Sequence, residues 1–248
     1  MTSSFKQLFL MNLRLVYRNT SGIFFTLVMP ALIYVGLSVL PIGGGLGGDF
    51  NYSQFLLPGI IAMTIMQGGI YGLAYWMIDL KSRGVIKRYL VTPLSQGELV
   101  ISVLASRIIV AIFQAVFLAL VGIIFFHVQV SLSVLFVIPM IILGGGIFLM
   151  VGLLISMFAD SYEAAAPITT AVGLPLTFLG NIFFTTDGLP KVLKLISQIL
   201  PITYLADAIR GVFLSSTFPS KVWTDAGVLL AWFVVILAFT LWKFRLKE

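Results

Sequence analysis

The sequence contains no cysteine, a single histidine and few charged residues. Without thiols there is no disulfide framework, no thiolate metal site and no cysteine nucleophile. Charged residues make up 10% of the chain, against roughly one-quarter in soluble domains, and hydrophobic residues make up 60%. One core cannot hold that many apolar side chains while so few charges cover its surface. The composition therefore predicts an integral membrane protein.

Motifs for enzymatic chemistry are also missing. The sequence has no Gly-x-x-x-x-Gly-Lys-Ser/Thr loop, no His-Glu-x-x-His and no Gly-x-Ser-x-Gly. The glycine cluster from Gly43 to Gly48 lacks a lysine and a following helix start, so we interpret it as an outer turn. The net charge of +6 comes from sparse, short basic clusters, which argues against nucleic-acid binding. We expect no catalytic residue, no metal site and no nucleotide site in this chain.

Charge-free stretches of bilayer length divide the sequence. A helix needs about 20 apolar residues to cross a hydrocarbon core about 30 Å thick. The stretch 108–159 is long enough for two passes, and a polar turn at 127–131 separates them. The sequence therefore predicts one all-α membrane domain over 1–248, with spans at 22–42, 56–79, 102–126, 132–158, 164–186 and 224–243.

The basic residues predict an orientation. They gather before the first span, between the second and third spans and in the C-terminal tail: Lys6, Arg14, Arg18, Lys81, Arg83, Lys87, Arg88, Lys243, Arg245 and Lys247. The connections 43–55 and 127–131 carry neither Lys nor Arg. By the positive-inside rule both termini are expected in the cytoplasm of a cell membrane. The stretch 187–223 is an exception, because it would lie outside yet holds Lys191, Lys194, Arg210 and Lys221.

Two further segments have amphipathic patterns. Residues 1–20 are expected to form a helix on the inner leaflet, whose apolar side carries Phe5, Leu8, Phe9, Leu13 and Val16. The stretch 187–223 is too apolar for a plain loop and is broken by Pro201. We predict two short helices there, lying at the outer interface or dipping into it as a re-entrant pair.

The connection between the second and third spans carries a recognisable pattern. Asp79, Gly84, Arg88 and then Thr92-Pro93 follow one another within 79–98. This resembles the ABC type-2 permeases, the membrane subunits of ATP-binding-cassette exporters, whose first cytoplasmic connection forms a coupling helix on the ATPase subunit. Many members carry a glutamate shortly before the glycine, whereas this sequence has Lys81-Ser82-Arg83, so only Asp79 could take that role.

The resemblance implies a coupling helix within 80–98. Its apolar anchors would be Val85, Ile86, Tyr89 and Leu90, while Lys87 and Arg88 would face acidic or solvated surface. Thr92 and Pro93 would end the helix, because proline disfavours the α conformation at the preceding residue. The alternative interpretation is an ordinary positive-inside loop.

Two more matches to the family lie elsewhere in the chain. One opens the second span as Pro58-Gly59-Ile60. The other is the outer pattern before the last span, with Pro201, Thr203, Tyr204, Asp207 and Arg210. Their order and spacing agree with the family over essentially the whole chain.

Several polar and small residues fall at membrane depth. Gln67, Gln114 and Asn181 are expected to form interhelical hydrogen bonds, with substrate contact along a translocation path as the alternative. Gly68 and Gly72 would allow helices to approach closely, within one subunit or across a dimer. For Arg107 we favour a side chain that reaches toward the inner surface over a buried functional charge.

The resemblance implies a permease of a bacterial exporter that moves a hydrophobic or amphipathic compound, such as a drug, an antibiotic or a lipid-like molecule. Two separate ABC ATPase subunits would bind ATP and Mg, and a second copy or a similar permease would complete the complex within the membrane lipids. The alternatives are a secondary transporter or channel driven by an ion gradient, and a scaffold that transports nothing. Carboxylates and histidine are nearly absent from the spans, which disfavours ion relays.

Overall fold

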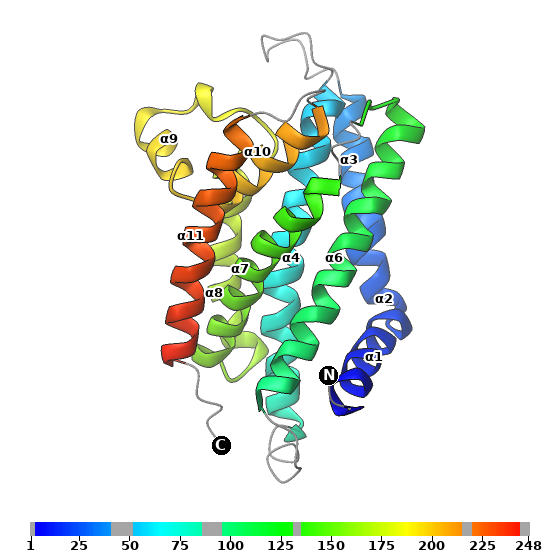
Figure 1. Ribbon diagram of the computed structural model, residues 1–248, viewed down its shortest axis with the longest axis vertical. Helices are drawn as coiled ribbons and strands as arrows, with labels where there is room; N and C mark the ends of the chain where they lie inside the picture. The colour runs from blue at the N-terminus through cyan, green and yellow to red at the C-terminus, as the bar shows by residue number, and fades with distance from the viewer. Residues whose placement is uncertain (1–2, 41–51, 86–95, 131–134, 215–219, 244–248) are drawn as a thin grey trace.

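The computed structural model describes residues 3–40, 52–85, 96–130, 135–214 and 220–243. The described chain is helical, and its long helices run side by side in one bundle (Figure 1). The bundle consists of a first segment made of α2 (Thr20–Ile23), η1 (Phe24–Val28) and α3 (Met29–Val39), followed by α4 (Tyr52–Ser82), α6 (Gln96–Phe126), α7 (Val137–Phe158), α8 (Tyr162–Leu179) and α11 (Ser220–Lys243). Outside it lie α1 (Ser3–Arg18), η4 (Thr186–Gly188), α9 (Lys191–Ser197) and α10 (Pro201–Leu214).

Helix length and hydropathy agree with a multi-pass membrane protein. Five described segments are long and apolar enough to cross a bilayer, namely Thr20–Val39, α4, Gly97–Phe126, α7 and α11. Helix α8 is less apolar, but its 18 residues cover about 27 Å and it packs against α4 and α7. Each predicted span therefore overlaps one long segment of the bundle.

Helix α8 is shorter than the predicted span 164–186. It ends at Leu179 with Gly180 as its C-cap, and Asn181 follows with φ of 55°. A left-handed residue cannot continue a right-handed helix, so the chain turns here. The sequence showed an uncharged stretch but not this stop, because 180–186 contains neither a charged residue nor a proline.

Helices α4 and α7 form the centre of the bundle. In α4 every side chain from Leu56 to Met66 is buried, and α7 buries most of its length against it. The outer helices instead expose large apolar side chains, such as Phe113 and Ile124 on α6 and Val235 on α11. Such side chains fit a surface that faces lipid rather than water.

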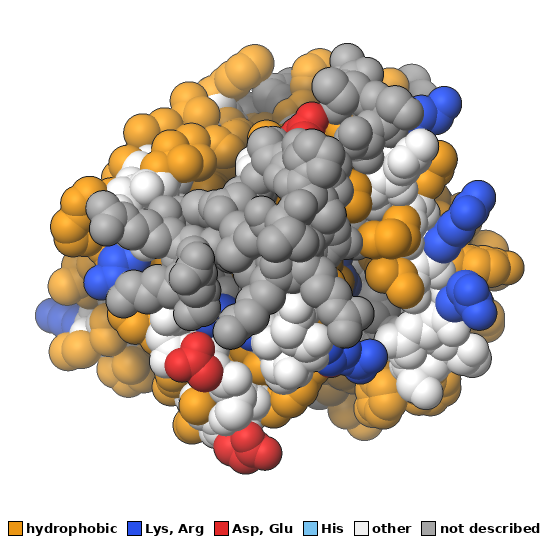
Figure 2. All heavy atoms as spheres, turned by 90° about the horizontal axis from the view of Figure 1, so that it is seen from below, with side chains coloured by type: hydrophobic (Ala, Val, Ile, Leu, Met, Phe, Trp, Pro, Cys, Tyr) orange, Lys and Arg blue, Asp and Glu red, His pale blue; other side chains and the backbone are white. Residues whose placement is uncertain are grey.

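The two ends of the bundle differ in charge. Helix α1 and the C-terminal ends of α4 and α11 lie at one end (Figure 1), which we call the basic end. Its described basic residues are Lys6, Arg14, Arg18, Lys81, Arg83 and Lys243. Figure 2 looks at this end and shows Lys and Arg side chains on both of its sides. Helices α9 and α10 lie at the opposite end, so the basic residues predicted to share one side do share one end.

The two amphipathic segments, α1 and the pair α9 and α10, lie in different environments. Helix α1 packs on α6 and buries Leu8 on its predicted apolar side, while Leu15 and Tyr17 point outward. Helix α9 exposes Val192 and Leu195, as expected at a lipid interface. Helix α10 bends from α9 by 75° and is buried against α4, α7 and α11. The pair therefore dips into the bundle rather than lying flat on it.

Candidate functional site

A cavity of about 460 Å³ opens between the first segment, α4, α6 and α7. Gln67, Gly68, Gly72 and Gln114 all line it, as does Arg107. Four of the five residues predicted for a translocation path or helix packing thus lie around one space. Asn181 is the exception, because it lies near the opposite end of the bundle in contact with α10. Ordinary ligand cavities have volumes of about 300–1,000 Å³, so this one has room for a small organic molecule.

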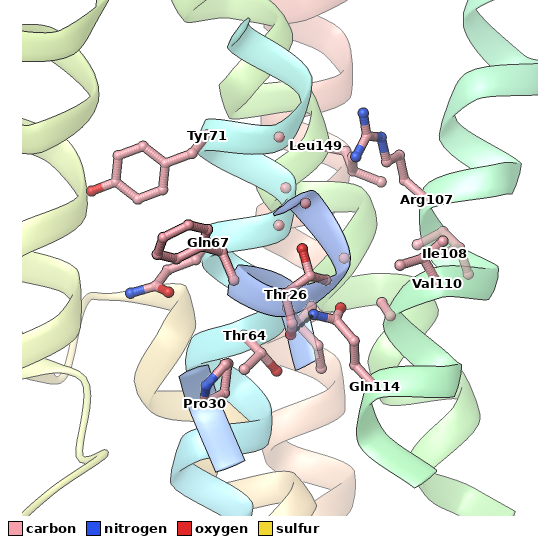
Figure 3. A pocket seen from close by; sticks show the side chains of 18 of the residues that line it. Thr26, Pro30, Thr64, Gln67, Tyr71, Arg107, Ile108, Val110, Gln114 and Leu149 are labelled. Atoms are coloured by element: carbon pink, nitrogen blue, oxygen red, sulfur yellow. Dashed lines mark hydrogen bonds between the residues drawn. The ribbon is translucent and has the colours of Figure 1, made fainter. Parts of the chain in front are cut away.

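Gln114 connects α6 to the irregular first segment. Its Nε2 donates to the carbonyl oxygen of Thr26 at 2.8 Å (Figure 3). Thr26 lies in a π-helical turn, four residues before Pro30. Proline has no N–H, so the α-helical bond from residue 30 to that carbonyl cannot form, and the Gln114 amide supplies a donor there. One amide predicted at membrane depth therefore makes an interhelical hydrogen bond, although it bonds to the backbone.

The closest helix approach involves the neighbouring Gly69, and not the Gly68 and Gly72 pair. A Cβ on Gly69 would lie 2.7 Å from Phe148 of α7, and one on Gly152 would lie 2.5 Å from the Gly69 carbonyl. A Cβ on Gly68 would meet nothing nearer than 4.0 Å. Within the subunit, Gly68 and Gly72 therefore leave space on the cavity side of α4 instead of forming a helix contact.

Arg107 points across this space toward α4. A Cβ on Gly72 would lie 3.4 Å from an Arg107 guanidinium nitrogen. Arg107 lies about three turns from the start of α6, and Gly72 lies about three turns from the end of α4, so both are about 15 Å from the basic end. The preferred sequence interpretation had this side chain reaching toward the membrane surface. In Figure 3 the side chain runs from α6 toward α4 and toward the basic end, and it also lines the cavity, so that interpretation stays a prediction.

The cavity also extends around α4 toward α8. In Figure 3, Gln67 and Tyr71 point away from Arg107. The Tyr71 hydroxyl lies against Gly173 of α8, where a Cβ would clash with it, and Tyr75 forms a hydrogen bond of 3.1 Å with Thr169. The two tyrosines therefore close this side by packing on α8.

A second polar site lies at the opposite end, around Asp207 of α10. Its Oδ1 accepts from Asn181 and from Arg210 Nη1 at 2.9 Å, and its Oδ2 accepts from Lys221 Nζ at 2.8 Å. Arg210 also donates to the Asn181 carbonyl at 2.8 Å and lies 3.9 Å from the Phe55 ring. The predicted Asp207 and Arg210 therefore join α8, α10, α4 and α11, and Lys221 completes the cluster.

This cluster accounts for part of the exception to the charge rule. Arg210 and Lys221, two of the four basic residues in the stretch 187–223, both pair with Asp207. Such pairing reduces the net positive charge that the end presents to its surroundings.

The other residues of the outer pattern set the bend between α9 and α10. Pro201 begins α10. The Thr203 hydroxyl donates to the Ser197 carbonyl at 2.7 Å, and the Tyr204 hydroxyl donates to the Gln198 carbonyl at 2.6 Å. These bonds add side-chain donors to carbonyl groups at the end of α9, of which the Ser197 carbonyl also accepts from the Leu200 N–H at 3.2 Å.

The predicted coupling segment is described only at its start. Helix α4 ends at Ser82, and Gly84 has φ of +64°, which ends the helix as a left-handed glycine does. Val85 is the last described residue before 96. The other coupling residues, Ile86, Lys87, Arg88, Tyr89, Leu90, Thr92 and Pro93, lie outside the described residues.

Two contacts fix the end of α4 that leads into this segment. Asp79 Oδ1 accepts from Arg83 Nε at 2.8 Å and from the Tyr162 hydroxyl at 3.3 Å. Lys81 Nζ donates to the Ser156 carbonyl and forms an ion pair with Asp160 at 3.3 Å. The last turns of α4, at the basic end, are thereby tied to the turn between α7 and α8. Asp79 thus contacts residues of the protein itself.

Comparison with known proteins identifies the family. The family model described as ABC-2 type transporter matches residues 3–214. The chain belongs to the ABC-2 type transporter family. The ABC-2 permease YadH, an inner membrane transport permease of Escherichia coli K12, is 28% identical over 220 residues, which are 86% of this chain and 84% of YadH. Nodulation protein J of Rhizobium leguminosarum bv. trifolii is 27% identical over 180 residues, covering 70% and 68% of the two chains.

A third relative has a more specific name. The probable multidrug ABC transporter permease YbhR of Escherichia coli K12 is 25% identical over 183 residues, covering 73% of this chain and 50% of YbhR. ABC-2 permeases are membrane transport subunits of ABC transporters and work with ABC ATPase partners. This chain is therefore a multi-pass membrane transport subunit.

Sequence reasoning missed two features of the ABC-2 permease site. It did not identify the carbonyl of Thr26 as the partner of Gln114, although Pro30 four residues later marks a carbonyl without a helical donor. It also did not place Lys221 with Asp207, since the two residues lie on different helices. The position of Pro30 was a signal for the first feature, whereas nothing in the sequence pointed to the pairing of Lys221 with Asp207.

Proposed function

We propose that this ABC-2 permease is the membrane half of an ATP-driven exporter of a hydrophobic or amphipathic compound. Two separate ABC ATPase subunits bind ATP and Mg and attach at the basic end, which faces the cytoplasm of a bacterial cell. A second copy of the chain, or a similar permease, completes the complex. The cavity beside α4 receives the compound from the inner half of the membrane.

The position of the cavity carries this proposal. Its lining reaches from Asn19 and Tyr75, on the side of the basic end, to Gln114, and it includes both apolar and polar groups. An amphipathic compound needs both apolar and polar groups in the lining of its binding cavity. The name of YbhR, a probable multidrug permease, agrees with a substrate of this kind.

The link between the cavity and the ATPase would be α4. Gly68 and Gly72 line the cavity, and the same helix ends at Ser82, directly before the predicted coupling segment. A helix is stiff, so a displacement at its inner end moves its cavity face as well. The ties of Asp79 and Lys81 to α7 and α8 would pass the same displacement to those helices.

The experiment pairs the chain with its ATPase. A candidate ABC ATPase from a neighbouring reading frame is co-expressed with the tagged permease, and inside-out vesicles are supplied with ATP and a fluorescent amphipathic dye. We expect co-purification and ATP-dependent dye accumulation. An ATPase variant without its phosphate-binding lysine should still co-purify but should not support accumulation.

Two outcomes contradict the proposal. Accumulation that persists without ATP and stops with an uncoupler indicates a transporter driven by an ion gradient. Failure of any ABC ATPase from the same genome to co-purify indicates that the chain does not act as the permease of an ABC exporter.

A further inference from the structure

The guanidinium of Arg107 has no anionic partner among the described residues. Three described carboxylates pair with other cations: Asp79 with Arg83, Asp160 with Lys81, and Asp207 with Arg210 and Lys221. No hydrogen bond from Arg107 to any described residue is present either, although the side chain lines the cavity. A cation at membrane depth without a partner is costly to keep and indicates a functional site.

The surroundings of Arg107 separate a charged zone from an apolar one. Arg107 and Glu98 are the charged residues of α6, and residues 108–126 contain none. From there the cavity extends outward past Ile108 and Ala111 to Gln114, about 10 Å farther along the helix. The opposite wall at this depth includes Ile65 and Leu149. One positive group thus lies at the inner end of a mostly apolar space.

We propose that the cavity binds an anionic amphiphile, with its carboxylate or phosphate group on Arg107 and its apolar part along Ile65, Ala111 and Leu149. Guanidinium pairs with carboxylate and phosphate through two parallel hydrogen bonds, which suits Arg better than Lys. The guanidinium reaches α4 beside Gly72, because α4 has no side chain at that position. The inference rests on the proposed function only for the direction of movement, because binding needs no ATPase.

Binding is measured with purified protein in a nonionic detergent. The probe is dansylundecanoic acid, an anionic fluorescent amphiphile, and its methyl ester is the uncharged match. We expect the acid to bind at least tenfold more tightly than the ester. Arg107→Gln should weaken binding of the acid at least tenfold and leave the ester unchanged, whereas Arg107→Lys should retain part of the preference.

A matched control removes the same charge elsewhere. Arg14→Gln lies on the exposed side of α1, so the preference for the acid should stay as in the unmodified chain. Equal affinity for acid and ester, or an unchanged affinity of Arg107→Gln for the acid, would overturn the proposal. The ester also reports folding, because a variant that still binds it retains the cavity.

Two sources of the anionic group are distinguished in the same assay. Phosphatidylglycerol in nanodiscs competes with the probe if a membrane lipid supplies the head group, and phosphatidylcholine serves as its zwitterionic control. Competition by phosphatidylglycerol would support the site and identify a lipid as its occupant. Absence of competition would support the site and point to a soluble amphiphile. Arg107-dependent binding together with failed ATP-dependent transport would contradict the proposed function and leave the binding site intact.

Discussion

The side-chain amide of Gln114 donates to the Thr26 carbonyl at 2.8 Å, across the cavity between α6 and the first segment. Thr26 is the residue whose helical donor would have been Pro30. A side chain distant in sequence thus donates to a carbonyl whose α-helical donor, the N–H of residue 30, is missing. This hydrogen bond ties the π-helical turn to α6.

Gln114→Leu should lower the free energy of unfolding by about 0.5–1.5 kcal/mol, the usual range for hydrogen bonds within membranes. Pro30→Ala restores an N–H that can reach the Thr26 carbonyl. In the Pro30→Ala background the same Gln114 substitution should therefore cost almost nothing. Reversible unfolding in mixed micelles measures this double-mutant cycle, and equal costs in both backgrounds would refute the account.

Gly152→Ala should destabilise the bundle by about 1–3 kcal/mol or more, because its Cβ would lie 2.5 Å from the backbone of α4. Gly68→Ala is the matched control, since its Cβ meets nothing nearer than 4.0 Å. That control should be neutral, or stabilising by up to about 1 kcal/mol, because alanine favours helix. Thermal unfolding followed by size-exclusion chromatography compares them. Similar losses for both would contradict the placement of the close contact at Gly69.

Asp207→Asn should lower the free energy of unfolding by about 3–5 kcal/mol, because the mostly buried Arg210 loses its counter-ion. The Lys221 side chain is 68% exposed, so Lys221→Gln serves as control and should cost at most about 1 kcal/mol. Unfolding in detergent is again the measurement. A loss for Asp207→Asn no larger than that of the control would show that the cluster does not stabilise the fold.

Impermeant thiol labelling tests the orientation, and the chain has no cysteine to interfere. Lys191 on α9 is exposed at the end opposite the basic end, and the Arg83 side chain is 71% exposed at the basic end. With both termini in the cytoplasm, Lys191→Cys should react in intact cells and Arg83→Cys only after the membrane is opened. These positions suit labelling better than the buried Thr203. The reverse pattern would invert the topology.

Arg88→Glu tests the coupling segment. If Arg88 contacts the ATPase, reversing its charge should reduce co-purification of the ATPase at least tenfold while membrane insertion stays normal. Arg18→Glu on α1 reverses a charge at the same end and should leave co-purification unchanged. Unimpaired association of the Arg88 variant would favour an ordinary positive-inside loop.

Much of the fold followed from the sequence. Uncharged stretches located the long helices, since bilayer thickness fixes their length, and the basic residues of α1, α4 and α11 share one end as predicted. The pattern around Gly84, Arg88 and Pro201 identified the family that the comparison confirmed. The role of residues 86–95 in coupling stays a prediction.

The sequence could not tell which faces of the central helices meet. Helix α4 is apolar nearly all around, so its periodicity does not indicate whether Gly68 or Gly69 contacts α7. The direction of Arg107 and the pairing of Lys221 with Asp207 likewise depend on neighbours distant in sequence. The sequence by itself determined the membrane environment, the approximate position of the long helices and the charged end, because each depends on local composition. Tertiary packing alone decided the cavity, because a hollow between helices exists only once their facing sides are chosen.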